Sequence, residues 1–292
     1  MQDVREALVD AALTRWPEYR WRESDLHRGA FHLVLTAPGG PSLRATLGRC
    51  GRERSRREAN TLLTLESARL ALTIPRVLDG PHWAESPRTW ITSLTTVPGS
   101  PTDDLTTCSV PRLSAYAETL NTLRAASSTC GNSLPPVRAW CGGDQWPDIV
   151  QRDLIPRLEA PVGAVAAERV ESLLETESHA VPMLCHGDFG PHNILWSEGK
   201  VASVIDFDHA CIGDPALDIA PLISFHGASS VTSLGSPEEI QRAMLHRATL
   251  PLQVAAAAHL AGLGQLRDHA LANFARRLAE RTLFDPAGKT PS

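Results

Sequence analysis

The sequence predicts a two-lobed α+β fold, with a small strand-rich N-terminal lobe and a larger helical C-terminal lobe. Short extended segments separated by turns dominate residues 1–97, whereas long segments with helical periodicity dominate residues 98–284. Between them lies the linker-like stretch Pro98-Gly99-Ser100-Pro101. We therefore place the lobe boundary after residue 97. The tail 285–292 has little apolar content and is expected to be disordered.

Local patterns predict the elements of the first lobe. Val4, Leu8 and Ala12 recur at helical spacing near the start. The turn sequence Ala37-Pro38-Gly39-Gly40-Pro41 separates two extended segments, which predicts a hairpin. The expected elements are a helix over 3–15, strands over 31–36 and 42–47, a helix over 53–69, and extended segments over 76–78 and 90–97.

The second lobe is expected to be mostly helical. Apolar periodicity predicts the helices, and a short hairpin around residues 197–200 interrupts them. The expected helices cover 111–126, 147–158, 164–178, 215–224, 237–247, 251–263 and 266–283, and the extended segments cover 194–196 and 201–206.

Composition excludes several classes of protein. The 292 residues carry 28 basic and 33 acidic side chains, a net charge of −5, so a nucleic-acid partner is not expected. The N-terminus lacks a basic region followed by an apolar stretch, and the apolar run 250–264 is too short to span a membrane. The six cysteines are scattered without a Cys-x-x-Cys pair, which indicates a reduced, cytoplasmic setting.

Residues 184–218 hold the side chains with the clearest chemistry. Asp188 and Asn193 lie five positions apart in a loop that contains glycine and proline, and Asp206 follows a predicted hairpin. That hairpin can return Asp206 beside Asn193, so that one carboxylate and one amide share a metal ion. Phosphoryl transfer needs such oxygen ligands for magnesium and a further carboxylate near the attacking hydroxyl, which Asp188 supplies.

Three motifs in order carry a resemblance. They are His186-Gly187-Asp188 with Asn193, then Ile205-Asp206-Phe207-Asp208, then Gly213-Asp214-Pro215 with Asp218-Ile219-Ala220. Together they resemble the aminoglycoside phosphotransferase family, whose members share the bilobal fold of protein kinases. The resemblance covers most of residues 25–225.

The resemblance implies a role for each residue of these motifs. Asp188 would be the catalytic base, and Asn193 with Asp206 would bind Mg²⁺. His186 would support the catalytic loop, and Asp214 and Asp218 would tie it to the following helix. The cosubstrate would be ATP or GTP and the partner a small molecule with a hydroxyl group. The oligomeric state stays open.

The first lobe is similar to the family's nucleotide-binding lobe in fewer residues. Arg44 would hold the triphosphate where the family usually has lysine, and Glu58 on the next helix would orient it. Arg49 is the competing candidate. Gly29 would belong to the loop over the phosphates, and Thr95 to the segment whose backbone meets the nucleotide base.

Other side chains have simpler interpretations. Asp208 either assists the metal or accepts backbone N–H groups, and we favour the second. His192 is expected beside the site rather than on the substrate. Buried, inert thiols are expected at Cys185 and Cys211, and core packing is the default for three tryptophans, Trp140, Trp146 and Trp196.

The predicted function is transfer of the γ-phosphoryl group to a hydroxyl of an antibiotic: an aminoglycoside, macrolide, nucleoside or peptide. Between Leu245 and Ala279 only Asp268 is acidic, which favours a less cationic acceptor than an aminoglycoside. The alternatives are a metabolic kinase for choline, homoserine, thioribose or a sugar, and a nucleotide-binding pseudoenzyme. The pseudoenzyme is disfavoured because Asp188, Asn193 and Asp206 are all present. A protein kinase is disfavoured because no Ala-Pro-Glu follows Asp206.

Overall fold

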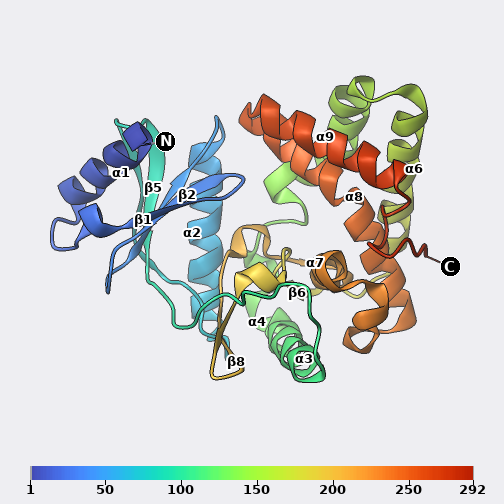
Figure 1. Cartoon of the computed structure of the whole chain (residues 1–292), viewed down its shortest axis with the longest axis horizontal. Coiled ribbons are helices and arrows are strands. Elements are labelled where there is room, and N and C mark those ends of the chain that lie inside the picture. The colour runs from blue at the N-terminus through green and yellow to red at the C-terminus, as the bar shows by residue number, and fades with distance from the viewer. Residues whose placement is uncertain (1, 292) are drawn as a thin grey trace.

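The computed structural model describes residues 2–291 and has two lobes (Figure 1). The first lobe is a five-stranded antiparallel sheet in the order β1-β2-β3-β5-β4, with a helix on either side. Its elements are α1 (Gln2–Arg15), β1 (Asp25–Arg28), β2 (His32–Thr36), β3 (Ser42–Thr46), α2 (Gly51–Ser67), β4 (Val77–Ala84) and β5 (Thr89–Leu94).

The alternation of β3 directs its side chains to opposite faces of the sheet. Leu43 and Ala45 are buried in the cluster that the sheet forms with α1. Arg44 lies between them in sequence, so its side chain leaves from the other face, where α2 lies. The two-residue period of the strand thus positions Arg44 toward the second lobe.

The second lobe is built mainly from helices around two small two-stranded sheets (Figure 1). β6 pairs with β9 and β7 pairs with β8, both antiparallel. The elements are α3 (Val110–Ala125), α4 (Ser127–Cys130), α5 (Trp146–Ile149), α6 (Ala160–Glu177), β6 (Met183–Cys185), β7 (Ile194–Ser197), β8 (Lys200–Val204), β9 (Cys211–Gly213), α7 (Ala216–His226), α8 (Pro237–Ala261) and α9 (Gly264–Ala279). Among residues 2–291, none of the helices combines the length and apolarity needed to cross a bilayer.

The structure differs from the sequence prediction in several elements, and strands β6 and β9 were not predicted. The helices expected over 237–247 and 251–263 form one helix, α8, which continues through the buried Pro251. An internal proline costs a helix roughly 3 kcal/mol, but α8 is buried along most of its length, and this packing compensates. Strand β1 was not predicted, since Leu26 is its one partly buried residue. The helix expected over 147–158 is α5 continued by short π and 3₁₀ turns to Arg157.

The first residue of the expected disordered tail lies inside the fold. The side chain of Asp285 is fully buried and accepts hydrogen bonds from the backbone N–H groups of Ala228 (2.7 Å) and Ala287 (2.6 Å). Residue 292 lies outside the described residues. The carboxylate of Asp285 therefore anchors the chain after α9.

The two lobes touch at a point far from the linker. The backbone N–H of Arg49 donates to the carbonyl of Ala261 at the end of α8 (2.9 Å). Gly48 has φ +86°, and a Cβ atom there would lie 2.7 Å from the same carbonyl oxygen. Only glycine permits this close approach of the two backbones. On the linker side, Ser100 and Trp196 exchange two backbone hydrogen bonds.

Candidate active site

The loop after β6 is held by the imidazole of His186. This fully buried ring accepts a hydrogen bond from the backbone N–H of Asp188 at Nδ1 (3.2 Å), so Nε2 donates to the carbonyl of Ile205 (2.8 Å). Both ring nitrogens are thereby assigned in the neutral form. The ring ties the loop that carries Asp188 to the segment that carries Asp206.

Asp218, in the first turn of α7, holds the same loop from the other side. Its carboxylate accepts the backbone N–H groups of His186 (2.9 Å) and Gly187 (2.7 Å). Gly187 has φ +83°, and any side chain there would collide with the carbonyl of His209. The loop therefore packs directly against the backbone at His209.

Asp214 has a different partner from the one the resemblance implied. It accepts hydrogen bonds from Arg242 Nε (2.8 Å) and His246 Nε2 (3.2 Å), both on α8, and from the backbone of Ala216 (3.0 Å). It thus ties the start of α7 to α8, and Asp218 alone of this pair binds the loop. Burial opposes ionisation of Asp214, but His246 and Arg242 outweigh it and lower its pKa to about 2.

Asp188 lies between an amide and an imidazole. Asn193 Nδ2 donates to the Asp188 carbonyl (2.9 Å) and lies 3.3 Å from Oδ2, and His192 Nε2 lies 3.7 Å from Oδ2. Burial opposes ionisation, but hydrogen bonding to His192 and the charges of His209 and His192 prevail and lower the pKa of Asp188. The carboxylate is therefore ionised at neutral pH.

Asp206 is brought beside this loop by one backbone contact. The N–H of Ile205 donates to the carbonyl of Asn193 (2.9 Å), as the sequence predicted from the intervening hairpin. Asp206 itself has φ +67°, a left-handed conformation that is uncommon for a residue other than glycine. Such backbone conformations gather at functional sites.

Arg44 contacts four side chains across the lobes. Its Nε lies 2.9 Å from Glu58 Oε1, and its Nη2 lies 2.7 Å from Asp206 Oδ1, 3.1 Å from Asp208 Oδ2 and 3.0 Å from His32 Nδ1. Burial alone would lower its pKa, but the three carboxylates raise it well above the usual value. The pairing of Arg44 with Glu58 is the one that the sequence predicted.

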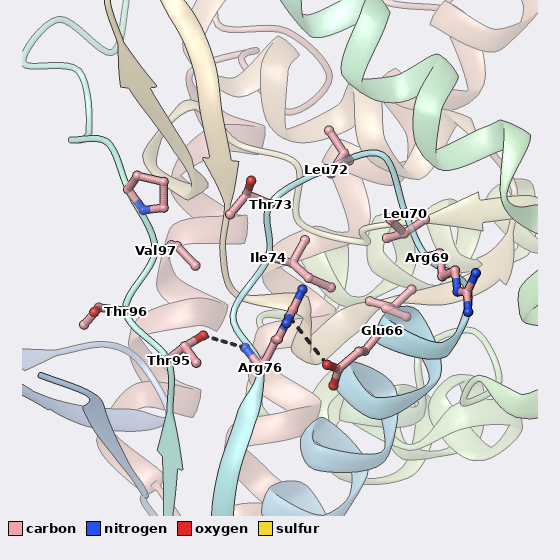
Figure 2. Close-up of a pocket in the computed structure, with 12 residues that line it drawn as sticks. Glu66, Arg69, Leu70, Leu72, Thr73, Ile74, Arg76, Thr95, Thr96 and Val97 are labelled. Carbon is pink, nitrogen blue, oxygen red and sulfur yellow. Dashed lines mark hydrogen bonds and ion pairs between the residues drawn. The ribbon is translucent and has the colours of Figure 1, made fainter.

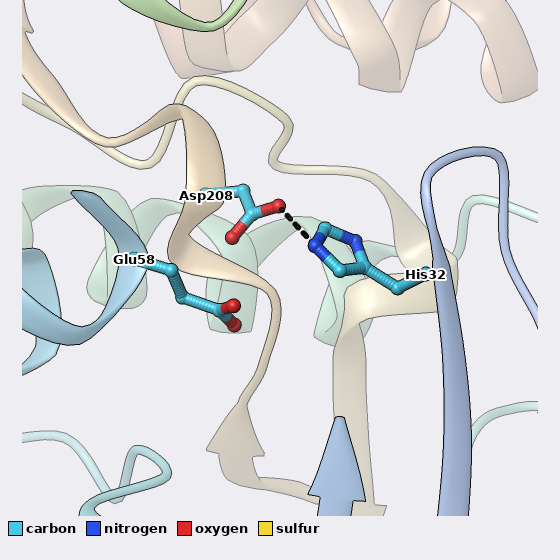
Figure 3. A group of neighbouring side chains, drawn as sticks. All are labelled: His32, Glu58 and Asp208. Carbon is cyan, nitrogen blue, oxygen red and sulfur yellow. Dashed lines mark ion pairs between the residues drawn. The ribbon is translucent and has the colours of Figure 1, made fainter. Parts of the chain in front are cut away.

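His32, Glu58 and Asp208 form a buried group whose donor atoms lie within 4.8 Å of one another (Figure 3). These donor types also suit a metal ion, but the guanidinium of Arg44 already lies against all three. Burial and the charge of Arg44 lower the pKa of His32 to about 3, so its ring is neutral. The preferred interpretation of Asp208 as an acceptor of backbone N–H groups was wrong, because its partners are Arg44 and His32.

A cavity of about 770 Å³ lies between the lobes next to these residues. Its lining includes Arg44, Glu58, Thr95, His192 and Asp206, together with Leu62, Leu94 and Phe207. Four of these lining residues are among the site residues that the sequence predicted: Arg44, Glu58, Thr95 and Asp206. Gly29 lies in the turn between β1 and β2, where its N–H donates to the carbonyl of His32 (2.9 Å), and does not line this cavity.

The side chain of Arg49 packs against the end of α8. Its guanidinium lies against Gly262, where an added Cβ atom would be 2.5 Å from Nε, and it does not line the cavity between the lobes. The end of a helix carries partial negative charge, which suits this cation. Arg49 therefore packs the lobes together at the end of α8.

A second cavity, of about 450 Å³, lies behind the linking segment (Figure 2). Here the N–H of Arg76 donates to Thr95 Oγ1 (2.9 Å), and Arg76 Nε lies 3.5 Å from Glu66. Thr95 is the one predicted site residue that lines it. Its lining includes none of Asp188, Asn193, Asp206 and Arg44.

One aromatic contact near Asp188 was missed by the sequence prediction. The rings of Trp140 and His209 stack with centroids 3.9 Å apart, and His209 is one of the residues whose charge lowers the pKa of Asp188. No spacing in the sequence links residues 140 and 209. Trp146 is fully buried as expected, and so are the thiols of Cys185 and Cys211, which face each other across β6 and β9. Trp196 is partly buried and packs against Tyr116.

The chain is similar in sequence to two known enzymes. The chain is 28% identical over 217 residues to the viomycin phosphotransferase of Streptomyces vinaceus, covering 69% of this chain and 73% of that enzyme. It is 27% identical to the hygromycin-B 4-O-kinase of Escherichia coli over 165 residues, which cover 52% of this chain and 48% of the kinase.

Solved structures share the fold. The GDP complex of an aminoglycoside 2′-phosphotransferase-IIIa variant superposes with a TM-score of 0.73 at 17% identity, covering 95% of this chain and 98% of that one. A macrolide 2′-phosphotransferase from Brachybacterium faecium superposes with a TM-score of 0.61 at 20% identity, covering 92% and 98%. The model of the phosphotransferase enzyme family matches residues 22–250. The chain therefore belongs to the phosphotransferase enzyme family.

Proposed function

We propose that the enzyme transfers the γ-phosphoryl group of ATP or GTP to a hydroxyl of an antibiotic and thereby inactivates it. The observation that carries this proposal is that Arg44 and Asp206 meet in the cavity between the lobes, and that a backbone bond from Ile205 to Asn193 places the loop with Asp188 beside Asp206. Phosphoryl transfer depends on such alignment and charge neutralisation, because it leaves the protein little covalent chemistry.

Asp188 is assigned as the base. Its lowered pKa keeps it ionised, so it can orient the acceptor hydroxyl and accept its proton. His186 and Asp218 accept three hydrogen bonds from the backbone of its loop, and His186 donates a fourth to the carbonyl of Ile205. These two residues act by positioning Asp188.

Asn193 and Asp206 are assigned to magnesium. Both offer oxygen donors, the kind that this ion prefers. Because Nδ2 of Asn193 donates to Asp188, its amide oxygen is the atom left for a cation. Asp206 is 38% exposed and lines the cavity. Bound magnesium would neutralise charge on the phosphates, and these two residues would hold it there.

The nucleotide is assigned to the cavity between the lobes. Arg44, steadied by Glu58, contacts the α- and β-phosphates, and the turn that contains Gly29 closes over them. The N–H of Thr95 is occupied by the carbonyl of Arg76 (2.9 Å). In the described part of the chain, the backbone N–H and C=O groups of Thr96 and Val97 make no hydrogen bond within the protein. We therefore assign the contacts with the base to Thr96 and Val97, and we place the enzyme in the cytoplasm, where nucleoside triphosphates are available.

The acceptor is assigned to the antibiotic class because both curated relatives are named for antibiotics. In the segment from Leu245 to Ala279 the single acid, Asp268, is 61% exposed at its side chain and pairs with Arg267. This region therefore offers little charge to a strongly cationic acceptor. Viomycin, hygromycin B and a macrolide are the first compounds to test.

The test combines resistance and turnover. The chain and its Asp188→Asn variant are expressed in a susceptible bacterium, and inhibitory concentrations are measured across antibiotic classes. We expect resistance to at least one class from the wild type alone, with a gain of one phosphate on the drug by mass spectrometry. No shift for any class, together with rapid phosphorylation of a common metabolite, would instead identify a metabolic kinase.

A further inference from the structure

A third cavity, of about 500 Å³, lies beside the N-terminal turns of α2. Its walls come from the first turns of α2, from residues 136–145 and from the end of α8, so both lobes contribute. It shares no lining residue with the cavity between the lobes. No step of the proposed reaction uses it.

The floor of this cavity holds a buried arginine without an anionic partner. Arg54 is 4% exposed, and its Nε and Nη1 make no hydrogen bond within the described residues. Its guanidinium carbon lies 4.1 Å from the centre of the Phe31 ring, and Nη2 reaches the Trp140 carbonyl at 3.4 Å. Stacking on Phe31 occupies the face of the guanidinium and leaves the N–H groups at its edge available.

Arg57, one turn later on α2, adds a second cation. It lines the same cavity, and its buried Nε also lacks a partner within residues 2–291. The acids on the lining, Glu53 and Asp144, are exposed and make no ion pair with either arginine in the described structure. Asp208 attracts both arginines, but Arg44 and His32 already engage it.

The protein compensates the desolvation of these charges only in part, mainly through Asp208. Burial lowers the pKa of both Arg54 and Arg57. A buried charge without a partner is costly, whereas a bound oxyanion accepts hydrogen bonds from two guanidinium edges at once. The N-terminus of α2, a helix of 17 residues, adds partial positive charge on the same side.

We propose that Arg54 and Arg57 form a binding site for a small oxyanion, a phosphate or carboxylate group, in the cavity between α2, residues 136–145 and α8. This site goes beyond the proposed function, because it needs neither nucleotide nor turnover. The Trp140 side of the cavity offers an aromatic surface to the rest of the ligand. Since both lobes form its walls, the bound anion bridges them.

The experiment is a titration of the full chain with inorganic phosphate by isothermal calorimetry, against sodium chloride at equal ionic strength. A non-hydrolysable ATP analogue with Mg²⁺ is kept saturating so that phosphate does not enter the nucleotide cavity, and its own binding is measured separately. We expect phosphate to bind the wild type. The affinity should fall at least tenfold in Arg57→Gln, which is only partly buried, and in Arg54→Gln. The matched control is Arg56→Gln, an exposed neighbour on the same helix that does not line the cavity.

Equal phosphate affinity in the wild type and in folded Arg57→Gln, or no phosphate binding to the wild type, would overturn the proposal. Because the experiment measures the affinity for phosphate, its result does not depend on whether the enzyme inactivates an antibiotic. A further arm adds the acceptor identified by the resistance panel. Displacement of phosphate would show that the acceptor carries the anionic group, and simultaneous binding would show that a separate ligand does.

Discussion

The guanidinium of Arg44 lies 2.7 Å from Oδ1 of Asp206, although the two residues are 162 positions apart and belong to different lobes. The proposed phosphate ligand and the proposed metal ligand are thus paired with each other. A triphosphate that binds between them must compete with Asp206 for Nη2 of Arg44. Glu58 and Asp208 still hold the arginine in place when this happens.

The first prediction concerns Arg44. Arg44→Ala should raise the KM for the triphosphate at least about tenfold and leave the KM for the acceptor nearly unchanged, because charge-assisted hydrogen bonds contribute roughly 1.5–3 kcal/mol each. Steady-state kinetics with each substrate varied would measure this. Arg49→Ala is the matched control. It should lower the free energy of unfolding, since Arg49 packs on α8, without a comparable change in KM.

The second prediction concerns Asp188. Asp188→Asn keeps the size of the side chain and removes its capacity as a base. We expect kcat to fall about 10²- to 10⁴-fold while nucleotide affinity stays nearly intact, because proton transfer matters in the transition state. Single-turnover rates and ADP titrations would measure the two quantities. Retention of more than about a tenth of wild-type turnover would contradict the role.

The third prediction concerns Asp206. Asp206→Ala removes a proposed magnesium ligand and also the partner of Arg44. We expect turnover to be lost and the magnesium dependence of nucleotide binding to weaken, whereas binding of the metal-free nucleotide should be kept or improved, because Arg44 is released. Titrations of nucleotide with and without magnesium would measure this. An unchanged magnesium dependence would reject the assignment.

The fourth prediction concerns Asp214 and pH. Its folded-state pKa of about 2 lies below the ordinary 3.8, so its ionised form stabilises the fold by about 2 kcal/mol. This stabilisation is fully present above pH 3.8 and is lost as the pH falls through 2. The free energy of unfolding of Asp214→Asn should therefore lie below that of the wild type at pH 6 and approach it toward pH 2. Denaturant titrations would measure it, with the exposed Asp103→Asn as control. A constant difference over this range would contradict the assignment.

The elements and the position of the loop that carries Asp188 could be predicted from the sequence where the signal is local. The turn at residues 37–41 predicted the β2–β3 hairpin. The positions of Asn193 and Asp206 on either side of the β7–β8 hairpin predicted that Asp206 returns beside the loop that carries Asp188. In each case the positions that decide the structure are near one another in the chain.

The remaining parts depend on contacts between distant segments. No residue near Asp208 in the sequence indicates that Arg44 and His32 lie against it. The sequence therefore favoured a role for Asp208 as an acceptor of hydrogen bonds from nearby backbone N–H groups. Pro251 is a local signal to end a helix, and burial of α8 overrides it. The stacking of Trp140 on His209 joins two segments with no shared pattern. Such contacts follow from the tertiary arrangement, which single-sequence periodicity does not contain.

The approach of Gly48 to Ala261 gives the lobes a contact that does not depend on the linker. The chain connects the lobes once, through residues 95–101, and the backbone bond from Arg49 to Ala261 connects them again at the end of α8. The N–H of Val204 also donates to the carbonyl of Thr73 (3.0 Å), so backbone bonds join the lobes at more than one place. Any motion that separates the end of α8 from the first lobe must therefore break the bond from Arg49 to Ala261.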